Sequence, residues 1–375
     1  MMKADFIDEL LDGVEVVWTP LGEVADYEQP TKYLVKSQNY SDDFKTPVLT
    51  AGKTFILGYT DETNGIYNAS KNPVIIFDDF TTANKWVDFD FKAKSSAMKM
   101  ITSKNESVIL LRYIYHWINT LPSGLIEGDH KRQWISNYSY KLIPIPPLNI
   151  QAEIVRILDT FTELTAELTA ELTARKKQYN YYREQLLTFE EGEVEWKPLG
   201  ELAENHDSMR KPITSGLREI GDIPYYGASG IVDYVKDFIF DGDYLLVSED
   251  GANLLARRTP IAFSISGKSW VNNHAHVLKF NTYAERKYIE YYLNSIDLTP
   301  YISGAAQPKL NQRNLNAIHI PNPSLEDKER IVSILDKFDA LTSSITEGLP
   351  REIELRQKQY EYYRNMLLSF PKEEV

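Results

Sequence analysis

The sequence predicts an α/β protein in which two globular bodies are separated by two long antiparallel helices. The first observation is a repeat: residues 177–189 read KQYNYYREQLLTF and residues 358–370 read KQYEYYRNMLLSF, so nine of 13 positions are identical. The copies lie 181 residues apart, about half of the 375-residue chain. The second observation is that each copy ends a long stretch with apolar residues at helical spacing. A period this long indicates a duplicated body with its helix, not a solenoid of short repeats.

Further landmarks give the order of elements within each half. The segment WTPLGE at 18–23 returns as WKPLGE at 196–201, and proline-rich segments close the bodies at 143–148 and 318–325. Residues 1–13 resemble the end of the repeated helix, so we expect a circular duplication with a pseudo-two-fold relation. The predicted boundaries are 1–13 for this N-terminal helical segment, 14–148 for the first body, 149–195 for the central helix and linker, 196–324 for the second body and 325–375 for the C-terminal helix.

The two helical stretches are predicted from their periodicity. Residues 149–189 contain no Gly or Pro, which predicts one helix of about 40 residues. Residues 325–370 have the same pattern, with a possible interruption at 348–350, where the sequence is Gly-Leu-Pro. The first helix also holds a four-residue repeat, with Leu164, Leu168 and Leu172 one unit apart. One unit advances a helix by ~400°, so a unit can be gained or lost with little rotation of the apolar stripe.

The bodies are predicted to be mixed α/β. Buried-strand patterns at 73–77 and 243–247 are each followed by a polar turn. The carboxylate pairs in these turns, Asp78-Asp79 and Glu249-Asp250, favour turn and cap roles over nuclease chemistry because no nearby Lys completes a nuclease pattern. His274 and His276 would share one face of a strand, but no carboxylate or third His is spaced to complete a metal site. We therefore expect no metal.

Composition narrows the classes of protein further. The chain has no Cys, which excludes disulfides and thiolate metal sites and fits a reducing cytoplasm. We expect neither a membrane span nor a signal peptide, because no apolar run is long enough. The net charge is −13, but the acidic excess lies mainly on the helical stretches and leaves the bodies near neutral. Attraction to DNA would therefore depend on a partner that supplies much of the positive field.

Side chains of base-reading and phosphate-binding types gather in exposed stretches of both bodies. Arg and Lys suit guanine, Asn and Gln suit adenine, and hydroxyl groups suit phosphates. At an offset of 177 residues, Arg132 corresponds to Lys309 and His130 to Gln307. The candidate DNA-binding residues are Thr81, Thr82, Asn84, Lys85, His130, Lys131 and Arg132 in the first body, and Asn253, Arg257, Arg258, Asn272, Gln307, Lys309, Asn311 and Gln312 in the second.

Several of these motifs belong together. They are the two WxPLGE segments, the turns at 77–80 and 247–251, the Ile-Pro-x-Pro segments and the Thr-Ala-Glu-Leu units. In this combination the chain resembles the DNA-specificity (S) subunits of type I restriction-modification systems, and its first half is most similar to the EcoR124 type. The second half resembles that family only in these shared segments and their order.

The resemblance implies a division of labour. Each body would be a target recognition domain that reads one half of a bipartite site in double-stranded DNA, and the helices would set the spacer and bind two methyltransferase (M) subunits. Two ATP-dependent translocase-nuclease (R) subunits would join for restriction of phage DNA in the cytoplasm. The chain itself would be non-catalytic, with S-adenosylmethionine, ATP and Mg²⁺ on the partner subunits. The alternatives are a self-sufficient DNA methyltransferase or nuclease, and a coiled-coil scaffold without DNA contact.

Overall fold

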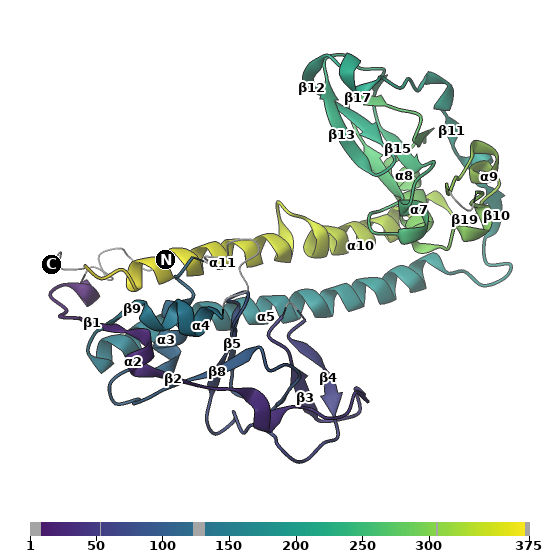
Figure 1. The fold of residues 1–375 in the computed structure, drawn as a ribbon. Helices are drawn as coiled ribbons and strands as arrows, with labels where there is room; N and C mark the ends of the chain where they lie inside the picture. The colour runs from purple at the N-terminus through teal and green to yellow at the C-terminus, as the bar shows by residue number, and fades with distance from the viewer. Residues whose placement is uncertain (1–8, 53, 123–131, 305–306, 372–375) are drawn as a thin grey trace. The chain divides into compact units, whose positions relative to one another are not determined.

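The fold is described by a computed structural model for residues 9–52, 54–122, 132–304 and 307–371 (Figure 1). Two compact units divide the chain. Unit 1 is drawn from Met1–Leu168 and Glu352–Val375, and unit 2 from Thr169–Arg351. Each unit contains one of the predicted bodies together with parts of the long helices. Leu10 and Leu11, within the short helical stretch at residues 9–11, pack against the core of unit 1.

Among its described residues, unit 1 contains three small sheets, with strand orders β2-β8-β5-β6, β4-β3-β7 and β1-β9. Its strands are β1 (Val17–Pro20), β2 (Ala25–Glu28), β3 (Thr46–Leu49), β4 (Ile56–Thr60), β5 (Val74–Asp78), β6 (Asn84–Val87), β7 (Lys92–Ala93), β8 (Met98–Ser103) and β9 (Leu142–Ile145). Its short helices are α2 (Leu21–Val24), α3 (Leu111–Ile118) and α4 (Gln133–Ser136).

Unit 2 is built in the same way, with strand orders β11-β18-β15-β16, β13-β12-β17-β14 and β10-β19. Its strands are β10 (Glu195–Pro198), β11 (Glu204–Asn205), β12 (Ile220–Gly227), β13 (Gly230–Val235), β14 (Phe240–Asp241), β15 (Tyr244–Ser248), β16 (Ala262–Ile265), β17 (Lys268–Val271), β18 (Ala275–Lys279) and β19 (His319–Asn322). Its short helices are α6 (Leu199–Leu202), α7 (Asn253–Ala256), α8 (Tyr283–Ser295) and α9 (Gln312–Asn316).

The two topologies correspond strand by strand. The sheet β2-β8-β5-β6 of unit 1 corresponds to the sheet β11-β18-β15-β16 of unit 2. In each of them one strand, β5 or β15, lies between two antiparallel neighbours. In both units, the second sheet joins an antiparallel hairpin to one parallel strand, β3 to β7 and β12 to β17. Unit 2 adds β14 and a longer helix, α8 in place of α3. The duplication inferred from short motifs therefore extends through the bodies, whose sequences differ strongly.

Each central strand separates two hydrophobic cores. Side chains alternate between the faces of a strand. Ile75 and Phe77 accordingly pack into one core of unit 1, while Val74 and Ile76 pack into the other. In unit 2, Leu245 and Val247 face one core, and Tyr244 and Leu246 face the other. Burial on both faces explains why these strands read as continuous apolar runs in the sequence.

A two-stranded clamp closes each body. β1 pairs with β9 so that Trp18 lies opposite Pro144, and β10 pairs with β19 so that Trp196 lies opposite Pro321. The repeated WxPLGE and proline-rich segments thus form the two strands of this antiparallel pair, in the same register in both units. A buried tyrosine fastens each clamp, because Tyr113 Oη donates to Pro144 O at 2.9 Å and Tyr288 Oη donates to Pro321 O at 3.0 Å.

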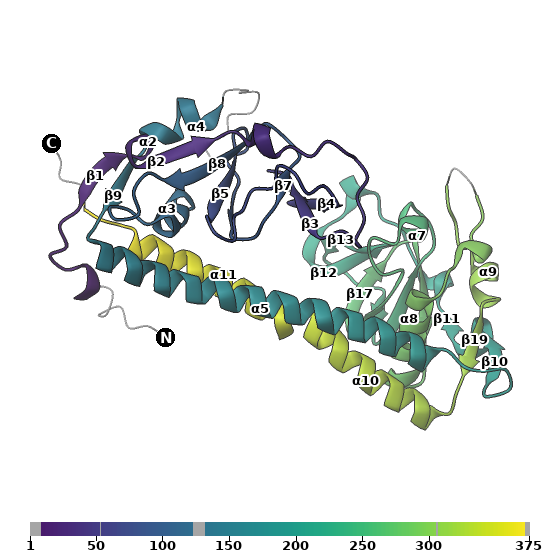
Figure 2. The same ribbon diagram turned by 90° about the horizontal axis from the view of Figure 1, so that it is seen from below.

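The long helices agree with their predicted extents. α5 (Leu148–Leu187) has 40 residues, and its first part packs in unit 1 against α11 (Gly348–Leu367), where the rings of Phe161 and Tyr363 stack at 5.2 Å (Figure 2). In unit 2 the last part of α5 packs against α10 (Leu325–Ser343), with Tyr179 and Phe338 6.0 Å apart.

The helix is interrupted at residues 344–347, between the end of α10 at Ser343 and the start of α11 at Gly348. The break therefore precedes the predicted residues 348–350, which form the first turn of α11. Gly348 has φ +77°, and a Cβ atom there would lie 2.3 Å from Ala340 O. Only glycine fits this junction without strain.

Candidate nucleic-acid interface

The turn after β5 is organised by Asp78. Its Oδ1 accepts hydrogen bonds from the backbone N–H of Phe80 at 2.8 Å and of Thr81 at 3.1 Å. Thr82 completes the turn with φ 61°, in the left-handed region. The predicted turn role is therefore confirmed for Asp78, whose carboxylate satisfies backbone donors that would otherwise be unpaired.

Asp79 has a different role, because it forms the centre of an ionic cluster. Its side chain is fully buried, and its Oδ1 accepts from the backbone N–H of Trp134 at 2.8 Å. Its Oδ2 lies 3.6 Å from Lys99 Nζ and 3.5 Å from Arg132 Nη1. Lys99 is itself fully buried, 4.5 Å from the centre of the Tyr27 ring, and burial lowers the pKa of its amine. The turn interpretation of Asp79 thus missed a buried ion pair with an exposed arginine beside it.

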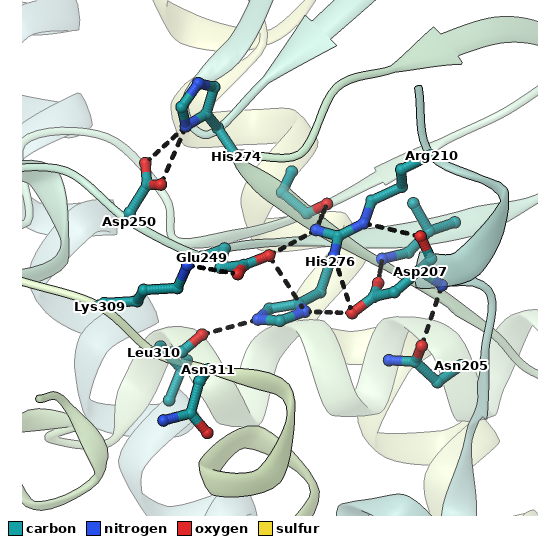
Figure 3. Close-up of polar contacts among 12 residues, drawn as sticks. Asn205, Asp207, Arg210, Glu249, Asp250, His274, His276, Lys309, Leu310 and Asn311 are labelled. Atoms are coloured by element: carbon teal, nitrogen blue, oxygen red, sulfur yellow. Dashed lines mark hydrogen bonds and ion pairs between the residues drawn. The ribbon is translucent and has the colours of Figure 1, made fainter. Parts of the chain in front are cut away.

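Glu249 occupies the equivalent position in unit 2 (Figure 3). Lys309 Nζ lies 3.1 Å from its Oε1, and Arg210 Nη1 forms an ion pair with its Oε2. Burial disfavours the charged carboxylate, but the hydrogen bond from Arg210 and the charges of His276 and Lys309 outweigh burial. They hold the pKa of Glu249 below its ordinary value. The predicted turn role of Glu249 is therefore incomplete in the same way as that of Asp79.

His276 joins this cluster from β18, at the position that Lys99 has on β8. Its Nδ1 lies 2.6 Å from Asp207 Oδ2, and its Nε2 lies 2.7 Å from Leu310 O. A carbonyl and a carboxylate both accept, so the His276 ring is held between two acceptors. Burial opposes ionisation of Asp207, but its hydrogen bond with His276 prevails and its pKa lies below the ordinary value.

The expectation that no carboxylate would lie near these histidines was wrong. Ligand atoms of Asp207, Glu249 and His276 lie within 4.8 Å of one another, a grouping that could hold a metal ion. The guanidinium of Arg210, however, lies against both carboxylates, 3.3 Å from Asp207 Oδ2. We interpret the cluster as an ion-pair network, because a bound cation would compete with Arg210 and Lys309 for the same oxygens.

His274 and His276 do not share a strand face as predicted. His276 is buried on β18, while His274 precedes that strand and is half exposed. His274 Nδ1 lies 2.9 Å from both carboxylate oxygens of Asp250. This pair, together with Gln307 and Lys309, lines a half-open hollow of about 840 Å³.

Comparison with known proteins identifies the family of this chain. The family model described as "Type I restriction modification DNA specificity domain" matches residues 14–175 and 191–355. The chain is 53% identical over 410 aligned positions to the EcoR124I/EcoR124II specificity subunit of Escherichia coli, covering 100% of this chain and 99% of that protein. This chain belongs to the type I restriction-modification DNA specificity family. The similarity to the EcoR124 type covers the whole chain and not the first half alone.

Other members of the specificity family are more distant. The EcoprrI specificity subunit of E. coli is 31% identical over 382 positions, which cover 92% of this chain and 93% of that protein. The crystal structure of the S subunit from M. genitalium has a TM-score of 0.67 at 16% identity and covers 96% of this chain and 98% of that one. At this identity the structural likeness supports the fold alone, an α/β architecture with two recognition bodies and a long helix.

The candidate DNA-binding residues of this family member are only partly brought together. Gln307 and Lys309 line the hollow that holds His274, and Asn272 accepts from the His274 backbone N–H at 2.8 Å. Arg257 and Arg258 line a different hollow, of about 370 Å³, beside Tyr179 and Arg183. In unit 1, Arg132 lies 5.9 Å from the Phe80 ring, in the turn that also carries Thr81 and Thr82. His130 and Lys131 lie outside the described residues.

Several candidate DNA-binding side chains make hydrogen bonds to other residues of the chain. Asn84 exchanges hydrogen bonds with the Asn119 side chain, and Asn253 Oδ1 accepts from the backbone of Arg258 and Thr259. Arg257 Nη2 donates to Ile296 O at 2.6 Å, and Asn311 caps α9 by accepting from the Asn314 N–H. Exposed side chains remain at Thr81, Lys85, Arg132, Arg258, Gln307, Lys309 and Gln312.

Two further predictions concern the leucines of the four-residue repeat and the absence of a membrane span. Leu164, Leu168 and Leu172 are partly buried along α5, in agreement with an apolar stripe. Among the described residues, no helix combines the length and the apolar character that crossing a membrane requires.

Proposed function

We propose that this chain provides DNA sequence specificity for a type I restriction-modification complex, with each body reading one half of a bipartite site in double-stranded DNA. The observation that carries the proposal is the repeated position of an exposed cation. Arg132 and Lys309 occupy equivalent positions in two bodies that share a frame and differ in their side chains. Two different surfaces on one frame suit the reading of two different half-sites.

The long helices would set the distance between the two half-sites and would bind the partner subunits. We propose that α5, α10 and α11 form an antiparallel, coiled-coil-like spacer with a pseudo-two-fold relation between the halves 14–148 and 196–324. Segments 149–195 and 325–375, with 1–13, would bind two methyltransferase subunits, and two translocase-nuclease subunits would join them. S-adenosylmethionine, ATP and Mg²⁺ would bind those partners. With a net charge of −13, the chain would depend on its partners for part of its attraction to phosphates.

The reading surface is tested by modification mapping of a host genome with the assembled methyltransferase complex. Arg132→Ala should relax one base position in one half-site, and Lys309→Ala one position in the other, at ~1–3 kcal/mol each. Lys32→Ala, which breaks the exposed Glu28–Lys32 ion pair, is the control and should leave the motif unchanged. If Arg132→Ala and Lys309→Ala both leave motif and rate untouched, the cations are not the reading groups. A change in both half-sites from one substitution would contradict independent reading.

The role of the helices in setting this distance is tested by shortening α5. Deletion of residues 169–172 removes one four-residue unit and ~6 Å of helix, so the unspecified gap should shrink by roughly one or two base pairs while both half-sites keep their sequence. Deletion of residues 170–171 alone should rotate the stripe by ~200° and abolish activity. An active four-residue deletion with an unchanged gap would show that the helices do not set the spacing.

A further inference from the structure

The carboxylates beside Arg132 and Lys309 stand at one position of the fold. Asp79 follows β5 and Glu249 follows β15, and each is fixed by a backbone hydrogen bond to the segment that carries the cation. Gln133 N donates to Asp79 O at 2.8 Å, and Leu310 N donates to Glu249 O at 2.7 Å. The distances from carboxylate to exposed cation are 3.5 Å in unit 1 and 3.1 Å in unit 2.

The remaining neighbours of these carboxylates share little chemistry. In unit 1 the second cation is Lys99, packed over Tyr27, and in unit 2 it is Arg210, in a network with Asp207 and His276. The two centres have in common a carboxylate with an exposed Arg or Lys beside it. The other residues that contact the carboxylate differ between the units.

Neutralisation of the carboxylates does not explain the exposed cations. A buried carboxylate needs a countercharge, and Lys99 already supplies one to Asp79, as Arg210 does to Glu249. Arg132 and Lys309 add a second cation, and their side chains remain 48% and 51% exposed. In unit 1 the two cations outnumber the single carboxylate. In both units the exposed cation faces solvent beside a carboxylate whose own backbone is fixed by hydrogen bonds.

We propose that Asp79 and Glu249 are positioning residues that hold Arg132 and Lys309 in the orientation in which these cations contact DNA bases. This inference rests on the proposed function. Long flexible side chains lose rotamer freedom when they bind, and a fixed carboxylate removes part of that freedom beforehand. The same carboxylate weakens simple attraction to phosphate, so the arrangement suits an oriented base contact more than a diffuse phosphate contact.

The test measures methylation of duplexes that carry single base changes in either half-site, with the complete methyltransferase complex. Glu249→Gln is nearly isosteric and leaves Asp207 to pair with Arg210 and His276. We expect Glu249→Gln to reduce discrimination at one base of one half-site by roughly tenfold, the low end for a bidentate base contact. Glu249→Asp should restore part of this loss. Glu219→Gln, which breaks the exposed Glu219–Lys236 ion pair, is the matched control and should change nothing.

Unit 1 needs a second variant, because Asp79→Asn alone would leave Lys99 buried without a countercharge. The double substitution Asp79→Asn with Lys99→Met removes both charges and keeps similar volumes. We expect it to relax one base of the other half-site while thermal unfolding of the complex shows that the body remains folded. Glu28→Gln, in the exposed Glu28–Lys32 pair, is the control for this unit.

Double-mutant cycles separate positioning from a structural role. Once Lys309 is Ala, Glu249→Gln should have no further effect on discrimination, since there is no cation left to hold. Equal effects of Glu249→Gln with and without Lys309 would overturn the inference, as would equal losses in both half-sites. If Lys309→Ala relaxes the motif and Glu249→Gln does not, the inference fails and the proposed function stands. If neither cation matters, the proposed reading surface fails first.

Discussion

The two bodies differ at their centres and agree at their edges. At the edges, the clamps share a register and each is fastened by one tyrosine, Tyr113 or Tyr288. At the centres, the carboxylate after the middle strand meets a lysine over an aromatic ring in unit 1 and a histidine–arginine network in unit 2. The shared strand topology therefore fixes the position of the carboxylate, while the residues that compensate its negative charge differ between the units.

The attachment of each body to its long helix shows the same contrast. In unit 1, Asp159 of α5 accepts from His116 Nε2 and Arg112 Nε, both at 2.8 Å. In unit 2, Asp336 of α10 accepts from Tyr291 at 2.6 Å and Tyr283 at 2.8 Å. The aspartates are repeated, while one donor in unit 1 is a histidine, which titrates near neutral pH, and both donors in unit 2 are phenols.

The largest expected difference comes from replacing Lys99 and His276, the buried residues at equivalent positions of β8 and β18. Lys99→Met leaves Asp79 buried with only a half-exposed arginine beside it, and should destabilise unit 1 by ~3 kcal/mol, the cost of breaking a buried pair. His276→Gln in unit 2 should cost about 1–2 kcal/mol, because Arg210 still pairs with Asp207. Hydrogen exchange in β5 and β15 measures both losses. Equal losses would mean that the two centres depend equally on the residue at this position.

A smaller difference should depend on pH. Burial, with the nearby charges of Arg112 and Arg364, lowers the pKa of His116 despite its hydrogen bond with Asp159; Tyr360 faces its other nitrogen. As pH falls through about 6.5, the unfolded chain takes up a proton that the folded unit resists, so stability present above that pH is lost. Tyr291, whose pKa is raised by burial, keeps its proton throughout.

Hydrogen exchange at about pH 7.5 and about pH 5.5 should therefore show unit 1 weakening more than unit 2. In His116→Gln this additional weakening should disappear. If the variant retained the full pH dependence of unit 1, another group would be responsible.

The smallest expected effect tests the shared edges. Tyr113→Phe and Tyr288→Phe each leave a proline carbonyl in the clamp without its donor, and each should cost ~1 kcal/mol in its own unit. Because the clamps share register and burial, the two losses should match. A loss twofold greater in one unit, measured by chemical denaturation with unit-specific exchange, would show that the edges have diverged as well.

Sequence reasoning predicted the features that depend on neighbouring residues. Periodicity gave the extent of α5 and an interruption close to Gly348, and matched segments located both clamps. It also aligned Arg132 with Lys309. It missed the roles of Asp79 and Glu249, because Lys99 and Arg210 reach them from segments distant in the sequence, and tertiary packing sets those contacts. Residue type alone also did not reveal that Arg257 donates to a backbone carbonyl and that Asn253 accepts from backbone N–H groups, because the fold brings those groups within reach.

The discontinuity of unit 1 has a consequence for protein synthesis. Unit 2 and both of its cores lie within one uninterrupted stretch, so they can close while translation continues. The core that joins Trp117 and Ile154 in unit 1 also contains Tyr363, Leu367 and Phe370, which leave the ribosome after all of unit 2. The unit begun first is therefore completed after unit 2, with apolar surface exposed in the meantime. A premature stop codon just after residue 351 would damage the core of the body at residues 14–148 and spare that of unit 2.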